Sequence, residues 1–206
     1  MSVSDEARYP EHDDGKWNEI LMVAAFVFGQ YGLRKTTMED IRREAHVARS
    51  TLYRYFSNKD EIFRAVVERE AEDMLEAVRL SVAEQETTRG KLRAAIMTYA
   101  DMIRHKVNVH RITQRALMDF TPAWTEHVQK MMRQLQDEFQ KILAEGVAGG
   151  EIAVEAPDLA ALTLVYALKG VFMNVAMDMR LASRDEIVDC LLDLMMDGMR
   201  PRRESV

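Results

Sequence analysis

The stretch TTMEDIRREAHVARSTLYRYFSNK, residues 36–59, decides the fold of this chain. It predicts two short helices joined by a tight turn at residues 46–48. Thr37, followed three residues later by Asp40, is the signature of a capping box, which marks the start of the first helix. The spacing of Ile41 and the apolar residues that follow predicts that this helix buries one face and exposes the other.

The second helix of the stretch, residues 49–56, is expected to be amphipathic. Leu52 and Phe56, spaced i, i+4, anchor it to the core. The opposite face then carries polar and aromatic side chains that point outward: Arg49, Ser50, Tyr53 and Arg54. A helix of this size with such an outer face fits the major groove of duplex DNA.

The segment AHVARSTLYRYFSNKDEIF, preceded by TTMEDIRREA, resembles the helix-turn-helix of TetR/AcrR-type bacterial transcriptional regulators. The family pattern runs roughly T-T-x-x-x-I-A-x-x-A-G-V-S-x-x-T-L-Y-x-Y-F-x-S-K-E-x-L, and the match spans residues 26–67. His46 stands where the family has the Gly of the turn, a residue that suits positive φ. Ala48 replaces the Ser that caps the second helix, and alanine cannot cap. We therefore expect a recognition helix slightly less stable than is typical of the family.

The resemblance implies two sets of DNA contacts, assigned by motif position. The side chains expected at phosphates are Lys35, Thr37, Tyr55 and Lys59. The side chains expected to face the bases or the groove are Arg49, Ser50, Thr51, Tyr53 and Arg54. Either arginine suits a bidentate bond to guanine, worth roughly 1–3 kcal/mol of discrimination, and Thr51 or Tyr53 suits a thymine methyl. For any one of these residues the alternative is a solvated side chain without a role.

The charge of the chain is unevenly distributed. The 206 residues carry 28 Lys and Arg against 34 Asp and Glu, a net charge of −6. Residues 30–64 hold eight basic and five acidic residues, a net +3, which leaves 20 basic and 29 acidic residues, a net −9, elsewhere. A local basic patch on an acidic protein indicates that one face docks on a polyanion such as DNA.

Composition also bounds the location and the redox chemistry. Cys190 is the single cysteine, which excludes an intramolecular disulfide and fits a reducing compartment. Its place on an apolar helix favours an inert buried thiol over a redox sensor. The polar residues 1–14 lack the apolar core of a secretion signal, and the longest apolar run, 159–168, is too short to span a bilayer. We expect a cytoplasmic protein with no membrane partner.

Helical periodicity continues along the whole chain, so the fold class is all-α with about nine helices. Three parts are expected: a mobile N-terminal arm over 1–14, a three-helix DNA-binding domain over 15–60, and a helical effector-binding and dimerisation domain over 61–206. Asn58 and Glu61 predict a second capping box. The helix that they open is expected to reach about residue 81 and to connect the two domains rigidly.

The second domain contains five further predicted helices. Thr88 is a candidate cap for the first, a short helix covers about 110–118, and Pro122 begins a long helix that ends near residue 147. Residues 158–180 are apolar nearly all round, and a capping box at Ser183 opens a final helix over 184–198. A helix that is apolar around its circumference needs cover on every side.

We therefore expect helices 158–180 and 184–198 to pack against the same pair of a second protomer, as the family resemblance also implies. The alternative is that the apolar helix is enclosed within its own domain.

The second domain is also the expected place of an apolar small-molecule effector, because methionines and aromatics there suit an adaptable pocket. The candidate lining residues are Met102, His105, Met118, Phe120, Trp124, Met131, Tyr166, Phe172 and Met173. Ordinary core packing is the alternative for each. His105 and His110 are five residues apart, on different faces of a helix, so no metal site is predicted, and no cofactor.

No enzyme motif such as G-x-S-x-G, H-E-x-x-H or a Walker loop occurs in the sequence. The sequence therefore predicts a homodimeric, non-enzymatic transcriptional regulator, a repressor released from a palindromic operator by its effector. One alternative is a helical small-molecule-binding or enzymatic module with a vestigial DNA-binding head. Another is a DNA-binding protein that responds to no ligand.

Overall fold

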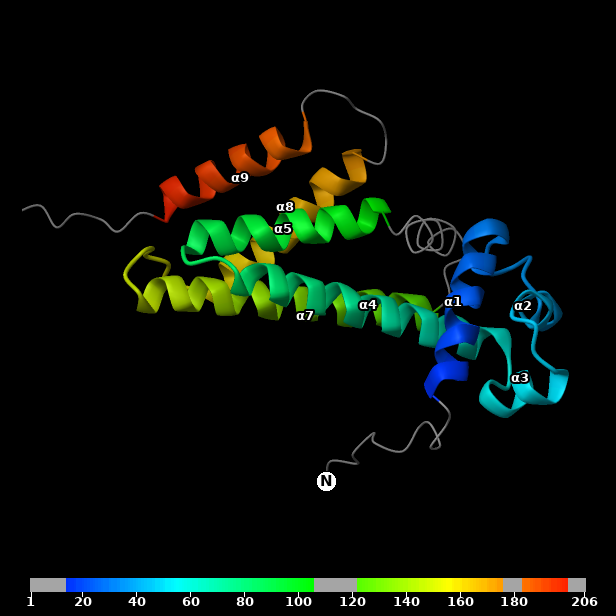
Figure 1. Ribbon diagram of the computed structural model, residues 1–206. Coiled ribbons are helices and arrows are strands. Elements are labelled where there is room, and N and C mark those ends of the chain that lie inside the picture. The colour runs from blue at the N-terminus through cyan, green and yellow to red at the C-terminus, as the bar shows by residue number, and fades with distance from the viewer. Residues whose placement is uncertain (1–13, 106–121, 176–182, 200–206) are drawn as a thin grey trace, which may run out of the picture. The chain divides into compact units, whose positions relative to one another are not determined.

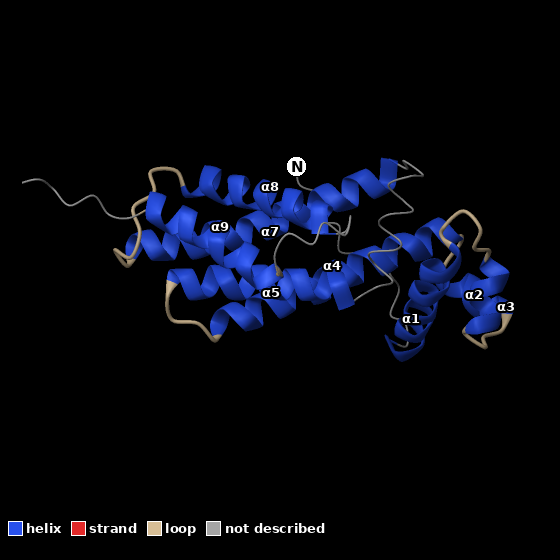
Figure 2. Cartoon of the chain, turned by 90° about the horizontal axis from the view of Figure 1, so that it is seen from above, coloured by secondary structure: helices blue, strands red, loops and turns tan. Residues whose placement is uncertain are grey.

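The computed structural model of the protein describes residues 14–105, 122–175 and 183–199. All regular secondary structure in these residues is helical, which confirms the all-α prediction (Figures 1 and 2). The eight helices are α1 (Asp14–Tyr31), α2 (Met38–Glu44), α3 (Arg49–Tyr55), α4 (Lys59–Ala83), α5 (Thr88–His105), α7 (Pro122–Ala148), α8 (Pro157–Val175) and α9 (Arg184–Gly198). The N-terminal arm and the helix predicted over 110–118 lie outside the described residues.

The described residues form two compact units, with one boundary between Glu70 and Ala71 inside α4 and another between Trp124 and Thr125 inside α7. The first unit contains α1, α2, α3, the first part of α4 and the first three residues of α7. Its fully buried side chains come from all four helices: Ile20, Leu21, Phe28, Ile41, Leu52, Phe56 and Ile62. Phe28 meets Phe63 edge to face at 5.4 Å, and Trp17 stacks on Phe56 at 6.3 Å. These ring contacts join α1 to α4 and to the residue that follows α3.

The start of α4 agrees with the sequence in one half of its predicted capping box. The side chain of Asn58 accepts from the Glu61 N–H at 2.9 Å, which confirms the cap. The Glu61 carboxylate, however, accepts from the Ser57 N–H at 2.7 Å, one residue before the predicted donor. The predicted reciprocal bond was therefore wrong by one residue, because the chain before α4 turns its Ser57 amide toward the carboxylate.

The second unit packs the rest of α4 with α5, α7, α8 and α9 around one apolar core. The side chains buried most completely include Leu92, Ile96, Leu135, Phe139, Leu143, Leu164 and Leu192. Ion pairs join α5 to α9: Arg93 binds Asp189 at 2.8 Å and Asp185 at 2.9 Å. Hydrogen bonds from Arg93 lower the pKa of Asp189, so its carboxylate stays ionised at neutral pH. These pairs fix which face of α9 points away from the unit.

The predicted cap of α5 was wrong by one residue. Thr87 caps the helix, since its hydroxyl accepts from the Gly90 N–H at 3.1 Å. Thr88 is instead the first helical residue, is buried, and donates its N–H to the Glu151 carboxylate at 2.8 Å. Burial against α7 is the physical reason, because it takes the Thr88 hydroxyl away from the free N–H groups of its own helix.

Gly146 of α7 packs closely against the side chain of Thr88. A Cβ at Gly146 would lie 2.3 Å from Thr88 Oγ1 and 2.8 Å from its Cγ2. We expect Gly146→Ala to lower the free energy of unfolding by about 1–3 kcal/mol, as overpacking of a well-packed core does. Urea denaturation measures this. Gly198→Ala is the control, because no atom lies within 4 Å of its Cβ position; Thr88→Ala in the same chain should restore stability to Gly146→Ala. Equal stability of all variants would contradict the prediction.

The outward faces of α8 and α9 carry large apolar side chains. Within the single chain Leu159, Tyr166 and Leu194 are exposed, so α8 is not enclosed by its own unit. Cys190 is also exposed, and the prediction of a buried thiol was wrong. The error has a physical reason, because Cys190 lies with Leu194 on the uncovered face of α9, whereas its apolar neighbours Val188 and Leu192 are buried on the opposite face. Among the described residues, no helix is both long and apolar enough to cross a membrane.

Candidate DNA-binding surface

The capping box that begins α2 is formed as predicted. Asp40 N–H donates to the Thr37 hydroxyl at 3.2 Å, and Thr37 N–H donates to the Asp40 carboxylate at 2.9 Å. The Thr37 hydroxyl donates to the same carboxylate at 2.6 Å. These bonds lower the pKa of Asp40, so the cap remains charged at neutral pH. Thr37 is exposed, and its hydroxyl is hydrogen-bonded within the capping box. Its predicted phosphate contact remains a prediction.

The turn between α2 and α3 places His46 at φ 51°, the left-handed region that favours glycine. The expectation of positive φ at this position is therefore confirmed. Arg42 braces the turn: its carbonyl accepts from the Val47 N–H at 3.2 Å, and its Nη1 donates to the Val47 carbonyl at 3.2 Å. The side chain and the backbone of Arg42 therefore both bind Val47, the residue that follows the strained His46.

Replacing His46 by glycine is expected to stabilise the first unit by about 1 kcal/mol, because glycine lacks the Cβ that penalises positive φ. The exposed imidazole makes little packing contact that would be lost. Thermal unfolding followed by circular dichroism measures the change. His46→Ala serves as the control, since alanine retains the Cβ and should bring no gain. If both variants melt at the wild-type temperature, the turn is not strained.

Helix α3 begins at Arg49, and its N-cap residue Ala48 provides no side-chain cap, as the sequence predicted. Its inward face buries Leu52, and its outward face exposes four side chains: Arg49, Ser50, Tyr53 and Arg54. Thr51 is half-buried. The Arg49 guanidinium lies 5.5 Å from the centre of the Tyr53 ring, and that of Arg54 lies 5.1 Å from the Tyr55 ring. Each arginine is thereby held near an aromatic ring before any ligand binds.

The residues predicted at phosphates lie in different environments. Lys35 is exposed. Tyr55 is buried to 6% exposure, and its hydroxyl accepts from Arg54 Nη2 at 3.4 Å. Lys59 donates to three carbonyls, those of Leu33, Arg34 and Thr36, at 2.9, 3.3 and 3.0 Å. In this structure its ammonium ties the loop before α2 to the start of α4, so the predicted phosphate contact of Lys59 remains a prediction.

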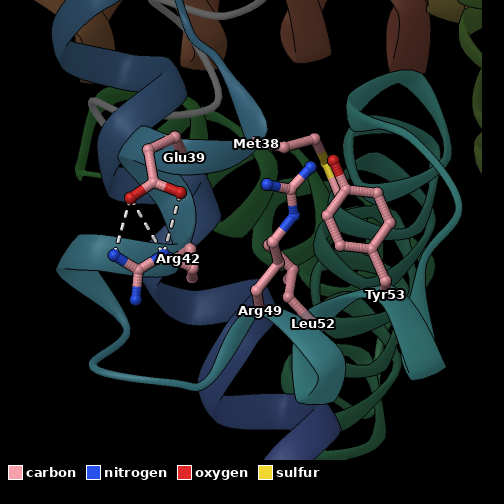
Figure 3. Close-up of a pocket in the computed structure, with 6 residues that line it drawn as sticks. All are labelled: Met38, Glu39, Arg42, Arg49, Leu52 and Tyr53. Carbon is pink, nitrogen blue, oxygen red and sulfur yellow. Dashed lines mark hydrogen bonds and ion pairs between the residues drawn. The ribbon is translucent and has the colours of Figure 1, made fainter.

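A hollow of about 350 Å³ lies between α2 and α3 beside the exposed face of α3 (Figure 3). Its lining residues come from both helices: Met38, Glu39, Arg42, Arg49, Leu52 and Tyr53. Reasoning from the sequence assigned no role to Met38, Glu39 or Arg42. One signal was present, since Arg42 stands where the family pattern has alanine.

Two family models match the chain. The model of bacterial regulatory proteins of the tetR family matches residues 20–66, which contain α2, α3 and the start of α4. A model of the tetracyclin repressor-like C-terminal domain matches residues 85–173. The chain belongs to the TetR family. Both matches agree with the resemblance seen in the helix-turn-helix stretch.

Named relatives of this TetR-family chain include an activator and a metabolic regulator. The HTH-type transcriptional activator FasR of Mycolicibacterium smegmatis is 30% identical over 99 residues, 48% of this chain and 45% of that protein. The chain therefore matches under half the length of FasR. The fatty acid metabolism regulator protein of Bacillus subtilis is 24% identical over 137 residues, 66% of this chain and 71% of that protein.

Solved structures share the fold. The fatty acid degradation regulator FadR of Bacillus halodurans superposes with a TM-score of 0.75 at 19% identity, over 93% of this chain and 100% of that chain. FadR of Bacillus subtilis in complex with stearoyl-CoA gives 0.74 at 20% identity, over 89% and 100%. At these identities the likeness establishes the helical fold of a TetR-family protein and nothing about the ligand.

The predicted effector-binding residues are only partly described. Met102 and Met131 are half-buried and pack against the core of the second unit. Tyr166 is 64% exposed on α8, so this chain places it on the outer surface and not in the core. His105, Trp124, Phe172 and Met173 belong to helices whose side chains are not described at those positions. Met118 and Phe120 lie outside the described residues.

Proposed function

We propose that the chain is a transcriptional regulator that reads duplex DNA with α3. The observation that carries this proposal is the exposed face of α3, where Arg49 and Arg54 are each held against a tyrosine ring. An arginine fork that is already ordered loses less entropy when it binds guanine in the major groove. The net positive charge of residues 30–64 adds attraction for phosphates. A protein that acts on the bacterial chromosome works in the cytoplasm.

The regulator acts as a homodimer through the outer faces of α8 and α9. Leu159, Tyr166 and Leu194 are exposed there in the single chain, and large apolar side chains of this kind are typical of dimer interfaces. A two-fold axis presents two copies of α3 to half-sites about one helical turn, 34–36 Å, apart. The operator is then palindromic.

The effector of this regulator is a long-chain fatty acyl-CoA. Two relatives are named for fatty acid metabolism or degradation, and one solved relative holds stearoyl-CoA. In this chain, half-buried methionines surround the core of the second unit, among them Met97, Met102, Met131 and Met132. Flexible thioether side chains adapt to an acyl chain at low cost.

The sequence offers charge for the CoA phosphates as well. Residues 104–115 contain Arg104, Lys106, Arg111 and Arg115 and no carboxylate. A ligand that is apolar at one end and anionic at the other fits such a domain.

The regulator is a repressor. The liganded protein has a lower affinity for DNA than the free protein, so the ligand relieves repression.

Selection of genomic fragments on the purified protein tests the proposal. At low salt we expect one enriched motif with two-fold symmetry, and palmitoyl-CoA or stearoyl-CoA should lower its binding while CoA alone does not. Failure to enrich any sequence would contradict the regulator proposal. Enrichment that no acyl-CoA changes, together with no rise in melting temperature on adding acyl-CoA, would remove the effector alone.

A further inference from the structure

Glu39 and Arg42 form an ion pair at the edge of the surface that carries the base-facing side chains. Arg42 Nε donates to the two carboxylate oxygens at 3.0 and 2.9 Å, and its Nη2 donates to one of them at 2.6 Å. Its Nη1 donates to the Val47 carbonyl at 3.2 Å. All three nitrogens of the guanidinium therefore have partners within α2 and the turn.

The carboxylate of this pair is the more accessible partner. The side chain of Glu39 is 62% exposed and that of Arg42 is 31% exposed. Both line the hollow that also contains Arg49 and Tyr53, and Figure 3 shows Glu39 and Arg42 on the side of the hollow opposite Tyr53. A negative charge thus stands open to solvent beside the arginine that is expected to read a base.

The charges around Glu39 keep it ionised. The hydrogen bonds from Arg42, and then the charges of Arg42, Arg49 and Arg43, lower the pKa of Glu39. Protonation therefore does not remove this charge at neutral pH. Arg49 acts on the Glu39 carboxylate through its charge alone, because no hydrogen bond links the two side chains.

A carboxylate at this place acts differently on correct and incorrect DNA. A phosphate that approaches the rim of α2 meets repulsion, and Arg42, which would otherwise attract it, is neutralised by its partner. Non-operator DNA is held mainly by phosphate contacts, so it loses most from this arrangement. Operator DNA is also held by hydrogen bonds to base edges, which the carboxylate does not weaken.

We propose that Glu39 is a specificity-determining residue. Its carboxylate neutralises Arg42, keeps this arginine from contacting the phosphate backbone, and so weakens binding of α3 to DNA outside the operator. The proposal rests on the proposed function, since it presupposes that α3 reads DNA. Specificity of this kind comes from a repulsive element placed against the wrong partner. Alanine at position 42, the residue of the family pattern, would leave Glu39 without its ion-pair partner.

The test compares Glu39→Gln with Glu44→Gln. Glu44 lies at the end of the same helix and is exposed, and it makes no ion pair with the described residues. Both changes remove one negative charge, but only Glu39→Gln removes the charge that neutralises Arg42. We expect Glu39→Gln to bind unrelated DNA about 10-fold more tightly than Glu44→Gln at low salt, with operator affinity within about 3-fold. The slope of log affinity against log salt should become steeper by roughly 1, the effect of one additional phosphate contact.

Equal affinity of the two variants for unrelated DNA would overturn the proposal. A changed base preference at one operator position in Glu39→Gln, found by selection from random sequences, would also overturn it and would assign Glu39 a direct base contact. Circular dichroism checks that each variant is folded. Arg42→Ala supplies a second probe: it should bind unrelated DNA more weakly than wild type, because the Glu39 carboxylate then lacks its neutralising partner. Wild-type protein that prefers no sequence would refute the proposed function itself, an outcome distinct from the other two.

Discussion

Arg54→Ala is expected to reduce affinity for the operator about 10- to 100-fold, the equivalent of roughly 1–3 kcal/mol for one bidentate contact to guanine. Arg54 is exposed on α3 and stacks at 5.1 Å on the ring of Tyr55, itself packed in the core. The substitution removes the fork but leaves Leu52 and Phe56, which hold the helix in place. Titration of a labelled operator at one fixed salt concentration measures the loss. Tyr53→Ala should weaken the operator complex as well, because Arg49 then loses its aromatic partner.

Two control variants separate reading of bases from attraction by charge. Arg133→Ala removes the same charge from an exposed position of α7, and we expect unchanged operator binding. Arg54→Lys keeps the charge and loses the planar fork, so affinity for unrelated DNA should persist while the preference for the operator falls. If Arg54→Ala and Tyr53→Ala both bind the operator like wild type, α3 is not the reading helix.

Local rules predicted much of the first unit correctly. The cap at Thr37, the uncapped start at Ala48 and the positive φ at His46 all depend on a few neighbouring residues. The structure reproduces each of them. Helix boundaries at Pro122 and Ser183 were predictable for the same reason. A capping bond or a turn conformation involves atoms only three or four residues apart, so a short stretch of sequence contains nearly all the information.

Apart from the local capping bond of Glu61, errors arose where packing between residues distant in the sequence decides the outcome. Thr88 was taken for a cap because the sequence does not show that Gly146 and Glu151 approach it. The sequence likewise does not show that the Lys59 ammonium binds carbonyls more than twenty residues away, although its predicted phosphate contact remains a prediction. Cys190 was expected in the core since its neighbours are apolar, and only the packed structure shows which apolar face is covered.

The Glu39–Arg42 pair was missed for a different reason. Glu39 and Arg42 are three residues apart on α2, a spacing at which opposite charges commonly pair on a helix surface. Such a pair is usually worth little and has no role, so the sequence alone gave no reason to single it out. Its position beside Arg49 in the hollow between α2 and α3 distinguishes it.

Leu194→Glu is expected to separate the dimer and to reduce operator affinity about 100-fold or more. Leu194 is 70% exposed in the single chain, on the outer face of α9 that also carries Cys190. A carboxylate at the centre of an apolar interface has no partner and must give up its hydration. When two heads are linked, the second binds as an intramolecular event, and losing the link costs about 10²- to 10⁴-fold in affinity.

Sedimentation equilibrium and operator titration on the same samples measure the two effects together. Leu80→Glu is the matched control, because Leu80 is a leucine of similar exposure, 60%, on α4 and away from the outer faces of α8 and α9. It should remain dimeric and bind the operator normally, which shows that an added carboxylate alone is harmless. A Leu194→Glu protein that stays dimeric would move the interface away from α9. A monomeric variant with full operator affinity would instead show that one copy of α3 suffices for recognition, and the palindromic operator would lose its physical basis.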